Sequence, residues 1–310
     1  MRIVFMGTPS FAGPALRLLK SNGYEIAAVY TQPDRPAGRG CKVSFSPVKQ
    51  IALELGLKVV QPVSLKKEEA FEELKSFAPD AIVVAAFGQI LNRAVLDLPR
   101  YGCVNIHPSM LPKYRGAVPV AASLLNGDSF TGVSIMLMDE GLDTGPVLSQ
   151  AQIPIQKYDN MGVLTDKLAF IGACMLLETL PDWAKGRILA RPQDEAAASY
   201  FRTITRESGI IDWSEDAVLI WNKVRAYYPW PGCYTRWQGK NIKIIEAAPV
   251  AWQGNAAIGE VIALPHGGAG VVTGRGVLNI VTLQPEGKKP MPSAEFLRGQ
   301  RQFIGSVLPS

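Results

Sequence analysis

Histidine, cysteine and long apolar runs are scarce in this chain of 310 residues, and each scarcity excludes a class of protein. The four cysteines form no CxxC pair and the two histidines stand far apart, so the sequence predicts neither a zinc site nor a disulfide framework. No apolar run approaches the roughly 18 residues of a membrane-spanning helix. Gly7-Thr8-Pro9 interrupts the first apolar segment, so we expect no secretory signal. The composition therefore predicts a cytoplasmic protein that needs no metal.

A large surplus of one charge sign is also missing. The 32 Lys and Arg residues stand against 27 Asp and Glu residues, a net charge of +5. This excess does not by itself define a nucleic-acid-binding protein, but it fits a polyanion bound on one local face. Apolar residues make up 47% and charged residues 19%, which excludes a disordered chain and a coiled coil, and the length favours two domains.

Short apolar segments alternate with helical patterns through the first half of the chain. Near-continuous apolar strands separated by helices are typical of a mostly parallel sheet covered on both faces, so we predict an α/β fold. The longest expected helix covers about 161–180. The expected strands of this sheet are residues 2–7, 25–30, 58–60, 80–87, 104–107 and 131–138.

The pattern changes towards the C-terminus. Residues 187–206 show no sustained strand or helix period, and we predict domains at 1–189 and 208–310 joined by a linker at 190–207. One helix, at about 215–227, precedes five short strand patterns separated by Gly and Asn. Five short strands in about 55 residues indicate a small antiparallel barrel, for which an OB-like closure is one possibility.

The two histidines lie in different contexts. His266 lies in a Pro-Gly turn and is expected to be a solvated loop residue. His107 ends the apolar strand that begins at Cys103, and the following Pro108 keeps it extended. Asn105 and His107 are two residues apart, so they share one face at the carboxyl end of a strand, where open parallel sheets bind ligands. A buried core histidine beside a structural Asn is the alternative.

An acidic, glycine-containing loop follows the strand at 131–138. Its carboxylates, Asp139, Glu140 and Asp143, follow the carboxyl end of that strand, so we expect one of them near His107, and the spacing does not select which. Amide, imidazole and carboxylate suit acyl transfer without a nucleophilic Ser or Cys, because Asn can donate to an oxyanion and His can carry a proton. The turn at Gly7 matches no dinucleotide or phosphate-loop pattern, and no cluster has metal-ligand spacing.

The run from Asn105 to Gly116, Asn-Ile-His-Pro-Ser-Met-Leu-Pro-Lys-Tyr-Arg-Gly, together with Asp143-Thr144-Gly145, resembles the core motif of the folate-dependent formyltransferases. Members of that family formylate several different amines, and some hydrolyse formyl-folate. Further segments are similar, in order and over both predicted domains, to the branch of the family that formylates methionyl-tRNA. These segments are residues 7–12, 31–49, 211–214, 227–232 and 283–291.

The resemblance implies a Rossmann-like formyltransferase domain followed by an OB-like barrel that binds tRNA, in a protein that is a monomer. The implied reaction transfers the formyl group of 10-formyltetrahydrofolate to the amino group of methionine on initiator tRNA. The motif's Asn, His and later Asp are catalytic in the family, which carries over to Asn105, His107 and Asp143. Met110 replaces a usual Leu of similar volume. The implied folate contacts are Ser109, Met110, Leu111, Pro112, Phe87, Gly88, Gln89, Ile90 and Asp139.

Basic residues supply the candidate tRNA contacts. Segment 31–49 carries more basic than acidic residues, and a basic loop beside an active site can bind phosphates, although a solvated surface loop is the alternative. Its candidates are Arg35, Arg39 and Lys42, of which the resemblance points to Arg39. In the second domain the candidates are Lys240, Lys243, Lys288 and Lys289, with Arg236, Arg298 and Arg301. Trp237 either stacks on a base or packs in the core.

Three other functions stay open. A formyltransferase that acts on a nucleotide-sugar amine would not need the basic residues at 35–42. A hydrolase of formyl-folate would keep the three catalytic residues and release formate without an acceptor. A non-enzymatic RNA-binding protein would use the barrel alone, and the polar residues at two adjacent strand ends argue against it.

Overall fold

The computed structural model describes residues 1–37, 42–201 and 203–309, and the chain divides into two compact units. The first unit consists of Met1–Pro119, Phe130–Pro154 and Thr165–Phe201. The second unit consists of Val120–Ser129, Ile155–Leu164 and Arg202–Ser310. The domain limits expected from the sequence, at 189 and 208, stay a prediction.

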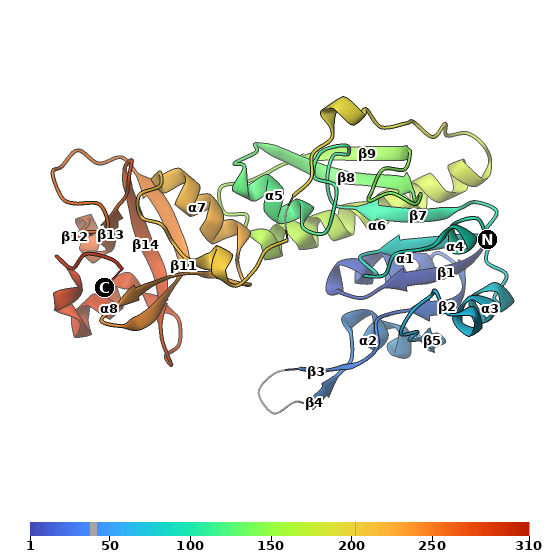
Figure 1. Cartoon of the computed structure of the whole chain (residues 1–310), viewed down its shortest axis with the longest axis horizontal. Helices are drawn as coiled ribbons and strands as arrows, with labels where there is room; N and C mark the ends of the chain where they lie inside the picture. The colour runs from blue at the N-terminus through green and yellow to red at the C-terminus, as the bar shows by residue number, and fades with distance from the viewer. Residues whose placement is uncertain (38–41, 202, 310) are drawn as a thin grey trace. The chain divides into compact units, whose positions relative to one another are not determined.

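A seven-stranded sheet forms the centre of the first unit (Figure 1). Its strand order is β5-β2-β1-β6-β7-β8-β9, and the four pairings from β5 to β7 are parallel. The predicted α/β class with a mostly parallel sheet is therefore confirmed. The strands are β1 Arg2–Gly7, β2 Glu25–Tyr30, β5 Val59–Val60, β6 Ala81–Ala85, β7 Cys103–His107, β8 Phe130–Leu137 and β9 Val147–Pro154. The sequence did not indicate β9, nor the short hairpin of β3 Arg35–Ala37 and β4 Lys42–Ser44.

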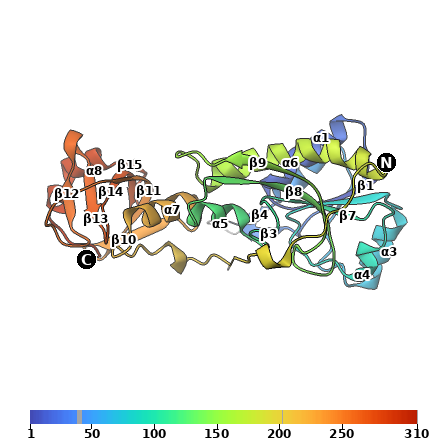
Figure 2. The same ribbon diagram turned by 90° about the horizontal axis from the view of Figure 1, so that it is seen from above.

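Helices cover both faces of this sheet, as Figure 2 shows for α1 and α6 on one side and α3 and α4 on the other. Alternate strand residues such as Val4 and Ile82 pack with Leu74 of α3 and Val95 of α4. On the opposite face Gly172 of α6 lies against Ile106 of β7, so closely that an added Cβ would be 2.5 Å from its side chain. The helices are α1 Gly13–Ser21, α2 Pro47–Glu54, α3 Glu68–Ser76, α4 Arg93–Leu96, α5 Pro119–Leu125 and α6 Met161–Ala184.

The direction of β8 differs from the sequence interpretation. We expected the strand at 131–138 to extend a parallel sheet and to release its acidic loop at the same edge as His107. Instead β8 runs antiparallel to β7, with Leu137 opposite Val104 and Ser134 opposite His107. The carboxyl end of β8 therefore lies beside the start of β7, and the loop after it must return along β7 to reach His107.

The second unit contains an antiparallel sheet in the order β10-β11-β14-β13-β12, with β15 paired to β14. The five strand patterns of the sequence thus form one antiparallel sheet, as expected. OB-like closure stays a prediction, because among the described residues no ladder joins β10 to β12. The elements are α7 Ala217–Ala226, β10 Cys233–Trp237, β11 Lys240–Val250, β12 Val261–Ala263, β13 Ala269–Val272, β14 Val277–Pro285, β15 Met291–Pro292 and α8 Ser293–Gly299.

Candidate active site

Strand β7 carries the two polar residues that the sequence singled out. Its pairing with β6 and β8 buries all five of its residues, and Asn105 and His107 are only 8% and 4% exposed. Both share a face with Cys103, whose thiol lies 3.6 Å from the Val95 carbonyl oxygen in α4. Polar side chains buried at this level need partners, in the protein or in a substrate.

Among the described residues, the side chain of Asn105 has no such partner. No hydrogen bond joins its side-chain amide to another residue in the described part of the chain, and the amide is not fully sealed from solvent. A buried amide without a partner costs free energy unless a ligand supplies one. Its N–H groups are therefore available to an oxygen of a bound substrate.

His107 is held at both ring nitrogens. Its Nε2 lies 3.0 Å from the backbone carbonyl oxygen of Tyr114, and since a carbonyl oxygen only accepts, Nε2 carries the proton. Its Nδ1 faces Asp143, at 3.6 Å from Oδ2. Burial lowers the pKa of His107 below its ordinary value, although Asp143 and the bond to Tyr114 oppose that shift. The imidazole is therefore neutral at pH 7, with an unprotonated Nδ1 beside a carboxylate.

The sequence left the carboxylate partner of His107 open, and the structure selects Asp143. Its Oδ2 accepts a hydrogen bond from the backbone N–H of Gly116 at 2.8 Å. Its backbone adopts a left-handed conformation, with φ of +55°, which few residues other than Gly take and Asp takes more readily than most. Two residues later, Gly145 packs directly on the end of β8: a Cβ added there would lie 2.0 Å from the Leu137 carbonyl oxygen. The loop therefore closes tightly on β8.

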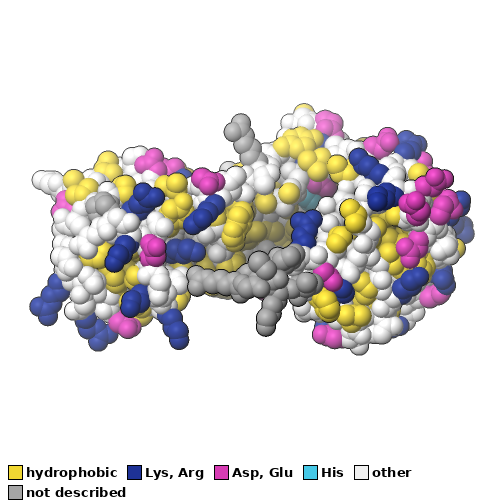
Figure 3. All heavy atoms as spheres, turned by 60° about the horizontal axis from the view of Figure 1, so that its bottom comes forward, with side chains coloured by type: hydrophobic (Ala, Val, Ile, Leu, Met, Phe, Trp, Pro, Cys, Tyr) yellow, Lys and Arg dark blue, Asp and Glu magenta, His cyan; other side chains and the backbone are white. Residues whose placement is uncertain are grey.

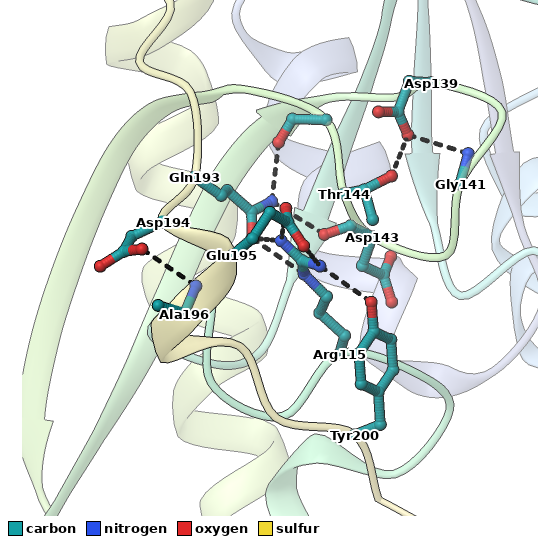
Figure 4. A network of polar contacts seen from close by, with 11 residues as sticks. Arg115, Asp139, Gly141, Asp143, Thr144, Gln193, Asp194, Glu195, Ala196 and Tyr200 are labelled. Atoms are coloured by element: carbon teal, nitrogen blue, oxygen red, sulfur yellow. Dashed lines mark hydrogen bonds and ion pairs between the residues drawn. The ribbon is translucent and has the colours of Figure 1, made fainter.

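Asp139, expected to contact folate, stabilises this same loop. Its Oδ1 accepts from the Gly141 N–H at 3.1 Å and from the Thr144 hydroxyl at 2.7 Å (Figure 4). Glu140 instead points to Arg93, with the two charged groups 3.8 Å apart. The return of the loop along β7 thus depends on an aspartate at its start and a glycine at its end.

A buried arginine, to which the sequence pattern assigned no role, adjoins the candidate catalytic residues. Arg115 is 1% exposed and donates to Gln193, Glu195 and Tyr200 (Figure 4). These partners raise the pKa of Arg115, the bond to Glu195 most of all, so its charge is permanent. Arg115 lies inside the 105–116 motif, but its partners lie about 80 residues away in a segment expected to be a linker.

Residues 109–112, which are expected to line the folate site, pack closely against the rest of the first unit. The Ser109 hydroxyl donates to the Lys113 carbonyl oxygen at 2.6 Å, and the Leu111 side chain is buried with Met136 and Val147. Met110 packs so closely on β8 that a Cβ added at Gly132 would lie 2.4 Å from its sulfur. The Pro112 carbonyl oxygen accepts from the Ser199 N–H. Contact of Ser109 to Pro112 with folate stays a prediction.

Residues 87–90, which follow β6, also make contacts within the first unit. Phe87 is buried in the core, and its carbonyl oxygen accepts from the side chains of Thr8 and Gln32. Gly88 follows in the left-handed region at φ of +84°. Gln89 uses its amide to bind the backbone of Leu65 and Pro62, whereas the Ile90 side chain is 78% exposed. Of the three side chains in this segment, that of Ile90 is open to a ligand without rearrangement.

The basic segment 31–49 is only partly described. Arg35 is exposed at the start of the β3–β4 hairpin, Arg39 lies outside the described residues, and Lys42 begins β4. Lys49 forms an ion pair with Asp34, and Gln61 donates to the same carboxylate at 2.9 Å. These contacts, that of Lys49 first, lower the pKa of Asp34. Lys49 thus has an internal partner, whereas the phosphate contacts of Arg35, Arg39 and Lys42 remain predictions.

The basic candidates of the second unit are exposed, and Figure 3 shows Lys and Arg side chains at several places on its visible face. Lys243 projects outward from β11 between the buried Ile242 and Ile244, and Lys240 lies at the start of that strand. Lys288 and Lys289 follow β14. Trp237 packs in the core, since its ring meets Phe296 and Phe303 edge-on at 5.8 and 5.1 Å. It is not available for stacking on a base.

The candidate catalytic residues Asn105, His107 and Asp143 supply one amide without a described partner, one neutral imidazole and one carboxylate, and none of the three is a Ser or Cys nucleophile. Such a set can stabilise an oxyanion and move a proton while an external amine attacks a carbonyl carbon. In the part of the chain that the structure describes, no group of three His, Cys, Asp or Glu side chains could hold a metal ion. No helix there is long and apolar enough to cross a membrane.

Comparison with known proteins identifies the family. Residues 1–180 match the formyl transferase family model, and residues 203–301 match the model of the formyl transferase C-terminal domain. A methionyl-tRNA formyltransferase of Dehalococcoides mccartyi strain CBDB1 is 50% identical over 308 residues, which is 98% of this chain and 97% of that protein. One of Roseiflexus sp. strain RS-1 is 48% identical over 310 residues, covering 99% and 95%.

Solved structures share the fold at low identity. An N-formyltransferase of Helicobacter canadensis, in complex with folinic acid and dTDP-3-aminofucose, superposes with a TM-score of 0.67 at 19% identity, over 90% of this chain and 97% of that one. Both units thus match models of one family, and the identity to relatives extends over nearly the whole chain. This chain is a member of the formyl transferase family.

Proposed function

We propose that this protein transfers the formyl group of 10-formyltetrahydrofolate to the amino group of methionine on initiator tRNA. The observation that carries the proposal is the identity of about half of all residues, across both units, to relatives named methionyl-tRNA formyltransferase. The folinic acid bound to a neighbour of the same fold supports a formyl-folate donor. An enzyme of initiator tRNA works where translation occurs, so the proposal includes a cytoplasmic location, and the family resemblance adds a monomeric state.

The geometry supports direct attack of the methionine amine on the formyl carbon. Asn105 donates a hydrogen bond to the formyl oxygen, which becomes negative as the amine attacks. Its side-chain amide is free for this role because it has no hydrogen-bond partner among the described residues. His107 takes up the proton of the incoming nitrogen at Nδ1, since Nε2–H is already bound to the Tyr114 carbonyl oxygen.

Asp143 completes the proton transfer. When Nδ1 of His107 gains a proton, the Oδ2 atom 3.6 Å away stabilises the imidazolium. The burial that lowers the pKa of His107 keeps the ring neutral beforehand, so it can act as a base at neutral pH. The proton then passes to N10 of the departing folate, directly or through water.

Formation of N-formylmethionine tests this function. The purified chain is incubated with 10-formyltetrahydrofolate and methionyl initiator tRNA, and the aminoacyl ester is hydrolysed and analysed for N-formylmethionine. Uncharged initiator tRNA and methionyl elongator tRNA are the controls. Formate released at the same rate without any acceptor would indicate a hydrolase, and formylation of a dTDP-amino sugar but not of the tRNA would indicate a sugar-modifying enzyme. Either result contradicts the proposal.

The salt dependence of tRNA binding tests the phosphate contacts. Each lysine that neutralises a phosphate steepens the plot of log Kd against log salt concentration by about one unit. We expect Lys288→Ala/Lys289→Ala to flatten that slope by about two. The matched control is Lys66→Ala/Lys67→Ala, an exposed adjacent pair just before α3 in the first unit. Equal slopes for the two double variants would remove Lys288 and Lys289 from the tRNA contacts.

A further inference from the structure

The segment from Gln193 to Tyr200 follows α6 and lacks any regular pattern in the sequence. In the structure it lies against two loops: residues 112–116 after β7, whose backbone binds His107 and Asp143, and residues 139–145 after β8, which carry Asp143 (Figure 4). We propose that this 193–200 segment positions the His107–Asp143 pair, with Gln193 as the positioning residue for Asp143. The inference deepens the proposed function, because it concerns the same reaction.

Gln193 is fixed in one orientation by groups of opposite character. Its Oε1 accepts from Nε and Nη2 of Arg115, at 3.1 and 3.0 Å, and a guanidinium can only donate. Its Nε2 donates to the carbonyl oxygens of Asp143 and Gly145, at 2.8 and 2.7 Å, and a carbonyl oxygen can only accept. The amide cannot be reversed without placing donor against donor and acceptor against acceptor.

The two hydrogen bonds that Gln193 Nε2 donates fix the loop backbone at Asp143 and at Gly145 just after it. Asp143 has a positive φ, which an L-amino acid keeps only when its surroundings impose it. The Gly116 N–H fixes the carboxylate end of the same residue. Gln193 and Gly116 together therefore determine where Oδ2 lies relative to Nδ1 of His107.

The same segment also fixes the other partner of His107. Ser199 accepts from the Tyr114 N–H through its hydroxyl and from the Arg115 N–H through its carbonyl oxygen, both at 2.9 Å. Tyr114 has a φ of +59° and presents the carbonyl oxygen that accepts the Nε2 proton of His107. The tautomer that leaves Nδ1 free thus depends on a backbone that Ser199 holds.

Arg115 anchors the segment. Its side chain is fully buried, and its Nη1 and Nη2 donate to the two carboxylate oxygens of Glu195 at 2.9 and 2.7 Å. Tyr200 accepts at its hydroxyl from Nη1 at 2.8 Å. A planar guanidinium with such a paired contact has little freedom to turn, so it gives Gln193 a rigid support.

Two substitutions separate the donor role of Gln193 from its contact with Arg115. Gln193→Glu keeps an acceptor for Arg115 but presents oxygen to the two carbonyl groups, whereas Gln193→Met removes both contacts at similar size. We expect kcat to fall about ten- to a hundredfold in both variants, with both KM values within about twofold, because in this proposal Gln193 acts through Asp143 and not by contact with a substrate. Gln302→Glu, at an exposed glutamine of the second unit, is the matched control and should leave kcat unchanged.

The titration of His107 gives a readout that does not depend on activity. The chain has only two histidines, so a sample labelled with 15N-histidine gives two sets of ring signals, and His266→Gln assigns them. Asp143 raises the pKa of His107, so its displacement in Gln193→Met should lower that pKa. A wild-type kcat in Gln193→Glu, or an unchanged pKa of His107 in Gln193→Met, would overturn the inference. If Gln193→Met does not fold, Gln193→Ala takes its place in the titration.

The two proposals fail separately. If the wild-type chain formylates no methionyl-tRNA, the proposed function is wrong, yet the ligand-free titration still decides whether Gln193 positions Asp143. If the wild-type chain is active and the Gln193 variants match it, only the positioning role is lost.

Discussion

His107 meets the carboxylate of Asp143 and Gln193 meets its backbone carbonyl, but only one of these two residues stands out in the sequence. The motif at 105–116 carries residue types that chemistry requires, so it can be read from the chain. The 193–200 segment carries a Gln, a Ser and a Tyr that any loop could contain. Residues proposed to react can thus be recognised in a sequence by their residue types. Residues that position them are recognised only from their contacts in the structure.

Among the variants considered, Asn105→Ala, in the 105–116 motif, should cause the largest loss of activity. Loss of one oxyanion donor typically costs about 2.7 to 4 kcal/mol of transition-state stabilisation, so kcat should fall roughly a hundredfold or more. Stability should hardly change, since the amide has no protein partner among the described residues to lose. Single-turnover rates and tRNA binding are the measurements. An equal loss of tRNA affinity would refute the assignment of Asn105 as a donor to the oxyanion.

Arg115→Met should give the next largest effect, this time on stability. The variant loses the hydrogen bonds to three side chains, and one buried hydrogen bond of a charged group typically contributes about 1.5 to 3 kcal/mol. The carboxylate left behind belongs to Glu195, which is largely exposed and can hydrate, so no buried charge is stranded. Urea unfolding measures the loss. Activity should fall with it, since Gln193 loses its support.

His107→Gln should alter how stability depends on pH. The folded state lowers the pKa of His107 from 6.5, so the unfolded chain binds a proton first as the pH falls. The wild-type free energy of unfolding is therefore unaffected by this group above about pH 6.5 and declines below it. The variant lacks that decline. Melting at pH 7.5 and 5.5 measures the difference, and His266→Gln is the control; parallel curves for wild type and His107→Gln would contradict a lowered pKa.

Glu195→Gln should give the smallest effect on kcat. It separates the contribution of the Glu195 charge from that of the Gln193 donor within the 193–200 segment. The side chain of Glu195 is 69% exposed, and an exposed ion pair contributes little. An amide oxygen can still accept from Arg115, so kcat should stay within about twofold of wild type. A loss as large as that of Gln193→Glu would mean that the charge of Glu195, rather than the donor of Gln193, supports the site.

The sequence predicted the α/β sheet, the antiparallel second sheet and the residue types of the site, because apolar periodicity and strand ends are local features. It did not predict the direction of β8, since an antiparallel strand and a parallel one have the same pattern when both faces are buried. Asp143 approaches His107 all the same, because Asp139 and Gly145 turn the loop back. The sequence pattern also showed no sign of the internal contacts of two basic residues: Lys49 pairs with Asp34, and Arg115 is buried with side-chain partners.

The contacts of Gln193, Ser199 and Tyr200 have a practical consequence for dividing the chain. The family model for the first part ends at residue 180, and a cut there or at 189 removes every side chain that Arg115 binds. A fragment made that way would keep Asn105, His107 and Asp143 and still leave the Arg115 guanidinium without these partners in its interior. An excised catalytic fragment should therefore extend to at least residue 201, where the first unit ends.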